Sequence, residues 1–283
     1  MPHTHEEGEL KERGVPGPQL YFHSVMPEKD PTAMVGIVPG YADHGARYAH
    51  VMDAWADRGI GSVALDLRGH GRATGARGHC SRFDEFLDDA SELAHLVSLR
   101  AKGAPMFLFG HSFGGLVATA SVLADKRSWR GLVLSAPYFG LALAVSPFKL
   151  AAGRIASRVA PRLGLPSGLM GKDMTHDPVR AAAYDGDPLV FPKATARWFR
   201  ETQKQQEQIV TRVAALDLPL YVTFGTQDPV AKMSAARAVF DAAGSTDKTW
   251  NAREGHYHEV LNELEWPELA GSIADWVLAH ARA

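Results

Sequence analysis

The chain alternates short, bounded runs of apolar residues with amphipathic helical patterns. The runs have four to six residues, lack strict polar alternation and are bounded by turn-forming residues, as is typical of buried parallel strands. These runs are Met34–Val38, Gly61–Asp66, Met106–Gly110, Leu132–Ser135 and Leu220–Gly225. The helical patterns are clearest at Phe83–Arg100, Gly115–Ala124 and Pro267–Ala281. The alternation predicts an α/β fold with a mostly parallel central sheet flanked by helices, whose ligands bind at the carboxyl ends of the strands.

One stretch, residues 139–204, breaks this alternation. It contains no good strand, only Ala-, Arg- and Leu-rich helical pieces separated by Pro161, Pro166, Pro178, Pro188 and Pro192. Because it is too long for a loop, we expect a helical cap inserted after the sixth strand. The α/β core then comprises residues 19–138 and 205–283. Residues 1–18 are polar and rich in Pro and Gly, which predicts a flexible lead-in.

Composition excludes several classes of protein. Thirty basic against 32 acidic residues give a net charge of −2, so bulk charge does not favour nucleic-acid binding. Cys80 is the only cysteine, which excludes an internal disulfide and Cys-based metal sites. The N-terminal residues lack the apolar core of a signal peptide, and the longest uncharged stretch, Gly131–Phe148, is interrupted by Pro and Gly. We therefore expect a soluble, cytoplasmic protein.

The segment Gly110-His111-Ser112-Phe113-Gly114 has the pattern G-x-S-x-G between a predicted strand and a predicted helix. A tight turn there pushes the serine hydroxyl out of the sheet, and the glycines keep Cβ atoms out of the bend. Ser112 is therefore the candidate nucleophile.

A serine nucleophile needs a base, and the base needs a carboxylate that holds its tautomer. In this kind of fold the acid and then the histidine follow the serine along the chain. Asp228, three residues past a predicted strand, fits the acid position. Asp217 precedes that strand and Asp66 precedes the serine, so both are weaker candidates.

Two histidines fit the position of the base. His256 and His258 both follow a short strand candidate, Thr249–Asn251, and precede the last helix. Spacing alone does not choose between them. No glycine-rich phosphate loop and no recurring metal-ligand spacing is present, so the predicted chemistry needs no metal and no cofactor.

Four motifs resemble those of the monoacylglycerol lipase and lysophospholipase group of α/β-hydrolases, which is grouped with the serine aminopeptidase-like hydrolases. They are GHSFGG (110–115), DLRGHGRATGARGH (66–79), GTQDPV (225–230) and EGHYHEVLNE (254–263). The resemblance extends from about Gln19 to the C-terminus. It implies the α/β-hydrolase fold, with Ser112 as nucleophile and Asp228 as acid. It also implies His258 as base, since the family's histidine follows Glu-Gly-x-Tyr, and a cap that shapes an acyl pocket.

An oxyanion hole of backbone N–H groups should accompany such a triad. One donor would be Phe113, directly after the nucleophile, and the other would come from the loop after Met34–Val38. In the group this loop usually begins with His-Gly, whereas here it begins with Pro39-Gly40. Alignment on the following Arg47-Tyr48 places the second donor at Tyr41.

The predicted cap carries ten Lys and Arg against five Asp and Glu, a net charge of +5. Within it Arg154, Arg158 and Arg162 recur every fourth residue, each followed by an apolar residue. Such a helix could lie on an anionic lipid surface, or its apolar stripe could pack on the core. A basic, apolar cap suits acyl chains better than the protonated amine of an aminopeptidase substrate.

These patterns predict a serine carboxylic-ester hydrolase that forms an acyl-enzyme on Ser112, with monoacylglycerols or related lipid esters favoured as substrates. The ester would be met in solution or at a membrane or micelle surface. Peptide or amide hydrolysis on the same triad is one alternative. A non-catalytic ligand receptor on the same scaffold, which can retain a triad, is another.

Overall fold

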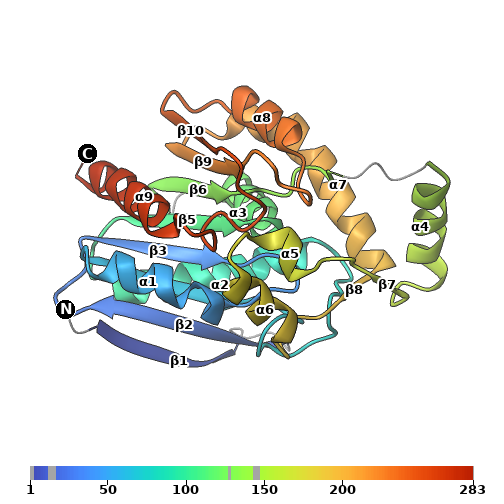
Figure 1. The fold of residues 1–283 in the computed structure, drawn as a ribbon, viewed down its shortest axis with the longest axis horizontal. Coiled ribbons are helices and arrows are strands. Elements are labelled where there is room, and N and C mark those ends of the chain that lie inside the picture. The colour runs from blue at the N-terminus through green and yellow to red at the C-terminus, as the bar shows by residue number, and fades with distance from the viewer. Residues whose placement is uncertain (1–2, 12–16, 127–128, 143–146, 283) are drawn as a thin grey trace.

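The computed structural model describes residues 3–11, 17–126, 129–142 and 147–282. An eight-stranded mixed sheet in the order β1-β2-β4-β3-β5-β6-β9-β10 forms its centre (Figure 1). The strands are β1 (His3–Lys11), β2 (Gln19–Pro27), β3 (Ala33–Val38), β4 (Ile60–Asp66), β5 (Met106–His111), β6 (Gly131–Ser135), β9 (Leu220–Gly225) and β10 (Lys248–Arg253). From β4 to β10 in this order, all neighbouring strands are parallel. Strand β2 pairs antiparallel with both of its neighbours, β1 and β4. All five predicted apolar runs lie in parallel strands, and the predicted fold class is confirmed.

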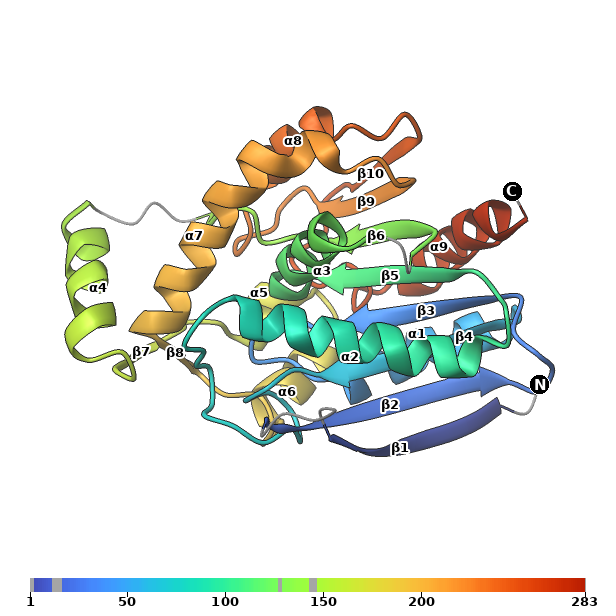
Figure 2. The same ribbon diagram turned by 180° about the vertical axis from the view of Figure 1, so that it is seen from behind.

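Helices cover both faces of the sheet (Figures 1 and 2). One face carries α1 (Ala49–Ala56) and α9 (Trp266–Ala281), and the other carries α2 (Asp84–Ala101), α3 (Phe113–Ala124) and α8 (Met233–Ala242). Because both faces are covered, every residue of β3, β4 and β9 is buried, which explains their continuous apolar sequences.

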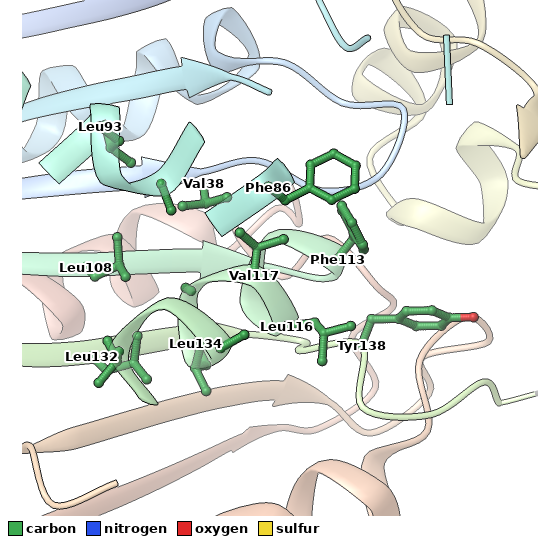
Figure 3. Close-up of a cluster of buried hydrophobic side chains, with 14 of the residues drawn as sticks. Val38, Phe86, Leu93, Leu108, Phe113, Leu116, Val117, Leu132, Leu134 and Tyr138 are labelled. Atoms are coloured by element: carbon green, nitrogen blue, oxygen red, sulfur yellow. The ribbon is translucent and has the colours of Figure 1, made fainter. Parts of the chain in front are cut away.

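The hydrophobic core between the sheet and α2 and α3 reaches the position of Ser112. Figure 3 shows Phe86 and Leu93 of α2 packed beside Val38, Leu108 and Val117, all of them fully buried. Phe86 and Leu93 are seven residues apart and therefore share one face of the helix. Phe113, the residue after the serine, belongs to the same cluster, so the turn that carries Ser112 is anchored in the core.

Strand β1 contradicts the prediction of a flexible lead-in over residues 3–11, whereas residues 1–2 and 12–16 of the predicted lead-in lie outside the described residues. It pairs with β2 along its whole length, and His5 Nε2 lies 3.0 Å from an Asp53 carboxylate oxygen of α1. An edge strand with an exposed face can be polar, which is why its sequence, HTHEEGELK, does not read as a strand.

The segment between β6 and β9 contains α4 (Pro147–Val159), α5 (Gly171–Met174), α6 (Pro178–Gly186) and α7 (Ala196–Arg212). The prediction that it has no strand is wrong, because β7 (Gly164–Pro166) pairs antiparallel with β8 (Lys193–Thr195). Strands of three residues are too short to leave a sequence pattern. Single 3-10 turns at Gly45–Tyr48 and Val213–Ala215 complete the elements.

Helix α7 crosses the predicted boundary at residue 204 and runs without a break from the insertion toward the core. Helix α4 stands away from the sheet and packs on α7 (Figures 1 and 2). Its apolar side chains Ile155 and Val159 are exposed, with 62% and 77% of their surface accessible. The alternative in which this stripe packs on the core is therefore wrong.

Among the described helices, none combines the length and the hydropathy that a bilayer crossing requires.

Candidate active site

Ser112 occupies a sharp turn between β5 and α3. Its backbone has φ 52° and ψ −118°, a conformation that non-glycine residues rarely adopt. The turn is held because the Ser112 N–H donates to the Ser135 carbonyl at 2.9 Å. A Cβ atom at Gly110 would lie 2.5 Å from the Gly114 carbonyl oxygen, so this bend requires glycine. The Gly-x-Ser-x-Gly pattern therefore has a steric cause in this chain.

Three of the predicted site residues form one hydrogen-bonded set. Ser112 Oγ lies 2.8 Å from His258 Nε2, and His258 Nδ1 lies 2.7 Å from Asp228 Oδ2. The other Asp228 oxygen accepts the backbone N–H groups of Val230 and Ala231 at 2.7 and 2.9 Å. Because a carboxylate can only accept, His258 carries its proton on Nδ1, which leaves Nε2 free to accept the serine proton.

The environment of His258 favours its protonated form. Burial alone would lower the pKa of this imidazole, but the charge and hydrogen bond of Asp228 raise the pKa above its ordinary value of 6.5. Glu259 adds to the effect through its charge. A general base with these neighbours can hold the serine proton during attack on a carbonyl.

His256, the other candidate base, has different contacts. Its Nε2 lies 3.5 Å from a Glu265 carboxylate oxygen, and burial lowers the pKa of its imidazole. The structure thus distinguishes two histidines that spacing left open, since His258 is the one within hydrogen-bond distance of Ser112.

The two weaker candidates for the acid, Asp66 and Asp217, make other contacts. Asp66 is buried and accepts the backbone N–H groups of Gly45 and Arg72, both at 2.7 Å, which fixes two loops. Asp217 is exposed and pairs with Lys126. Neither is recorded in contact with a histidine of the hydrogen-bonded set in the part of the chain that the structure describes.

The two expected oxyanion-hole residues, Tyr41 and Phe113, line the cavity on which Ser112 opens. Among the described residues, neither backbone N–H has a recorded hydrogen-bond acceptor. The Gly40 N–H donates to the Asp43 carboxylate at 3.2 Å, which holds the loop in place. Two N–H groups beside the serine are thus available to a substrate oxygen.

The Tyr41 side chain joins its loop to the insertion. Its hydroxyl donates to the Lys193 carbonyl at 2.6 Å, and its ring centroid lies 3.9 Å from that of Trp198. In the structure the phenol is 9% exposed and its hydroxyl is occupied by these backbone contacts.

A cavity of about 610 Å³ lies between Ser112 and the insertion. Its wall is mostly apolar, and side chains of the insertion supply much of it: Ala152, Ala156, Leu163, Leu165, Leu169 and Phe199. Polar groups, among them Asp43, His111 and Glu259, gather near the serine. The cavity is suited to an apolar chain whose polar end lies at Ser112.

Sequence reasoning missed one group of buried charges beside the site. Arg47 forms ion pairs with Asp43 and with Glu259, and all three side chains are almost fully buried. Glu259 lies in the EGHYHEVLNE motif, directly after His258, whereas Arg47 lies outside the four motifs, at the end of the Tyr41 loop. No signal in the sequence indicated that they meet, because they are 212 residues apart.

The parallel sheet, the sharp turn at Ser112 and the Ser–His–Asp set define an α/β-hydrolase. The family model described as "Serine aminopeptidase, S33" matches residues 29–265. The chain belongs to this family of hydrolases.

Similar proteins include a monoacylglycerol lipase of Mycolicibacterium smegmatis, 32% identical over 94% of this chain and 95% of that protein. Phospholipase YtpA of Bacillus subtilis is 34% identical over 83% of this chain and 91% of its own length. The crystal structure of Paleococcus ferrophilus monoacylglycerol lipase superposes with a TM-score of 0.83 at 27% identity, covering 92% of this chain and 99% of that one. The chain is accordingly an enzyme that hydrolyses carboxylic esters.

Proposed function

We propose that the protein hydrolyses monoacylglycerols or closely related lipid esters through an acyl-enzyme on Ser112. The observation that carries the proposal is the hydrogen-bonded set Ser112–His258–Asp228, of which Ser112 and His258 line an apolar cavity of about 610 Å³. The names of the relatives from M. smegmatis, B. subtilis and P. ferrophilus point to the same substrate class.

In the proposed reaction Ser112 Oγ attacks the acyl carbonyl while His258 Nε2 takes its proton. Asp228 stabilises the resulting imidazolium, and the N–H groups of Tyr41 and Phe113 donate to the oxyanion. The imidazolium then protonates the leaving alcohol, which departs and leaves the acyl group on the serine. A water molecule, deprotonated by His258, releases the fatty acid and restores the hydroxyl.

The cavity wall favours an ester over an amino-terminal peptide. A protonated amine would need an unpaired carboxylate near the serine. The carboxylates of Asp43 and Glu259 are at the cavity, but both are already paired with Arg47. An apolar acyl chain needs no such partner, which makes peptide hydrolysis the weaker candidate.

We further propose that residues 139–204 act as a cap on a core of residues 19–138 and 205–283. Residues from α4, β7, β8 and α7 line the cavity, which supports a role in holding the acyl chain.

The outer face of this cap is proposed to touch lipid. Ile155 and Val159 are exposed next to Arg154 and Arg158, which are also exposed. Leu163 is about half exposed and also lines the cavity, so the apolar surface continues into the site. Apolar side chains flanked by arginines suit the headgroup region of an anionic membrane or micelle. We also propose a cytoplasmic location, in keeping with the buried free thiol of Cys80.

Turnover of p-nitrophenyl esters from acetate to palmitate, beside a monoacylglycerol and an aminoacyl anilide, tests the substrate class. We expect hydrolysis of long-chain esters and of the monoacylglycerol, labelling by a fluorophosphonate, and loss of both in Ser112→Ala. Ser98→Ala removes an exposed helical hydroxyl and should leave both unchanged. Turnover of the anilide alone would move the protein to peptide hydrolysis, and a labelled Ser112→Ala variant would refute the nucleophile.

Flotation with vesicles containing phosphatidylglycerol tests the lipid contact. The double substitution Ile155→Ser and Val159→Ser should reduce the floated fraction, whereas Leu99→Ser should not. Leu99 is a suitable control because it is 66% exposed on α2, outside the cap. Equal flotation of all three proteins, or flotation independent of anionic lipid, would reject this part of the proposal.

A further inference from the structure

Arg47 bridges two buried carboxylates that come from distant parts of the chain. Its Nη1 lies 2.9 Å from Asp43 Oδ1 and 2.8 Å from Glu259 Oε1, and its Nη2 lies 2.7 Å from Glu259 Oε2. The pair with Glu259 is therefore bidentate, the geometry that a guanidinium makes best. Exposed fractions are 12% for the Arg47 side chain and 5% and 6% for Asp43 and Glu259. We call these three residues the ion cluster.

Asp43 fixes the loop that contains Tyr41. Its Oδ2 accepts the Gly40 N–H and, at 2.8 Å, the Tyr48 hydroxyl, and its Oδ1 accepts the His44 N–H at 2.8 Å. Four donors, that of Arg47 included, thus converge on one carboxylate. The backbone around Tyr41 has little freedom to move independently of Asp43.

Glu259 fixes the loop that contains His258. It is the next residue in the chain, and its backbone N–H donates to the Met174 carbonyl at 2.8 Å. Its Oε2 also accepts the Asn262 side-chain amide at 2.7 Å. A displacement of the Glu259 carboxylate would therefore be passed to the imidazole one residue earlier.

The sheet does not join these two loops directly. The Tyr41 loop follows β3 and the His258 loop follows β10, and β5, β6 and β9 lie between those strands. Within the described residues, Arg47 is the side chain recorded in contact with both Asp43 and Glu259. This guanidinium thus links the loop of an oxyanion donor to the loop of the base.

We propose that Arg47 is a positioning residue for catalysis, which holds the Tyr41 N–H and the His258 imidazole at the separation that ester hydrolysis requires. This inference rests on the proposed function of Ser112. In the described part of the chain, no recorded contact joins Arg47 to the serine or to the imidazole, so its effect acts through Asp43 and Glu259.

The charges of the ion cluster support this role. Burial would raise the pKa of Asp43 and of Glu259, but the Arg47 charge holds both below their usual range. Both carboxylates are therefore ionised at neutral pH and remain ion-paired with the Arg47 guanidinium. Without Arg47, two buried negative charges would face each other and the loops would have to rearrange.

The test compares Arg47→Met and Arg47→Lys with Arg58→Met in the full chain. Arg58 is the control, because it also joins two segments: it lies two residues after the end of α1 and contacts the Gly271 carbonyl and Asp275 of α9. With a short soluble p-nitrophenyl ester, Arg47→Met should lower kcat by about 100-fold and leave KM nearly unchanged. Arg47→Lys should recover part of the lost kcat, because an ammonium keeps the positive charge but cannot make the bidentate contact of a guanidinium. Arg58→Met should retain the kcat of the wild type.

A second readout does not depend on turnover. The His258 Nδ1 proton, shared with Asp228, should give a downfield proton resonance that Asp228→Asn removes and thereby assigns. We expect Arg47→Met to shift or broaden it and Arg58→Met to leave it in place. If Arg47→Met does not fold, Glu259→Gln, which keeps the shape and one acceptor, should give a smaller change in the same direction.

The outcomes separate the two proposals. A folded Arg47→Met variant with the kcat and the resonance of the wild type would overturn the positioning role, as would a loss confined to KM. A wild-type protein that neither hydrolyses esters nor reacts with a fluorophosphonate at Ser112 would overturn the proposed function. In that case the resonance comparison still decides whether Arg47 positions His258.

Discussion

Gly114 at the start of α3 lies against the backbone of Val38 at the end of β3. A Cβ atom at position 114 would lie 2.1 Å from the Val38 carbonyl oxygen. This contact brings the helix that follows Ser112 directly onto the loop that carries Tyr41. The second glycine of the Gly-x-Ser-x-Gly pattern thus sets the distance between the serine and that loop.

Replacing Gly114 by Ala should therefore damage both stability and reactivity. The methyl group would meet backbone atoms that cannot move aside, so we expect a loss of about 3 kcal/mol in unfolding free energy and slower fluorophosphonate labelling. Gly186→Ala is the control, because a Cβ there meets no atom within 4 Å. Chemical denaturation and labelling rates measure both effects, and a Gly114→Ala protein as stable as the control would contradict the contact.

Asp228→Asn should lower kcat by about 10⁴-fold with little change in fold. An amide can donate to His258 Nδ1 and so hold the imidazole in the tautomer that cannot accept the serine proton. Asp247→Asn alters a comparable pair, since Asp247 lies 2.9 Å from His280 Nε2 at the surface. Ester hydrolysis by this control should equal that of the wild type. An Asp228→Asn enzyme within about tenfold of wild type would remove Asp228 from the proposed triad.

The rate should fall on the acid side of neutrality. His258 accepts a proton only when it is neutral, and its pKa is raised above 6.5, so kcat/KM should decline as pH drops through a value above 6.5. His111 lies beside His258, but burial and the neighbouring His258 charge lower the pKa of His111 to about 4. The titration of His111 should therefore not contribute to the decline of kcat/KM just below neutral pH. Initial rates between about pH 5 and pH 9 give the midpoint. A midpoint below 6.5 would contradict the assignment.

Enlarging Ala156 should shorten the acyl chain that the enzyme accepts. Ala156 lies on α4 and lines the cavity, so Ala156→Phe fills space next to the apolar wall. We expect kcat/KM for palmitate esters to fall about tenfold or more, with acetate esters unaffected. Ala151→Phe adds the same ring to an exposed position of α4 that does not line the cavity. If both variants retain the chain-length profile of the wild type, the acyl chain does not lie under α4.

The parallel strands and the turn at Ser112 were predictable because each is encoded by contiguous residues. A buried strand is a short apolar run, and the bend at Ser112 needs glycine at fixed offsets. Strand β1 was not predicted, because an edge strand buries little surface and its residues are mostly polar, so it leaves no apolar run in the sequence. The insertion was predicted from its prolines and lack of long strands, but its short β7–β8 pair was not predicted. The sequence left open whether the apolar stripe of α4 faces outward or packs on the core.

The sequence by itself determined the α/β class, the candidate serine and acid, and a choice of two histidines, of which the family resemblance favoured His258. Only the tertiary structure decided which histidine reaches Ser112, where the Tyr41 phenol lies, and that Arg47 joins Asp43 to Glu259. The physical reason is that periodicity and turn chemistry describe burial and bends over a few residues. Contacts between loops that follow different strands depend on strand order and packing across the whole sheet.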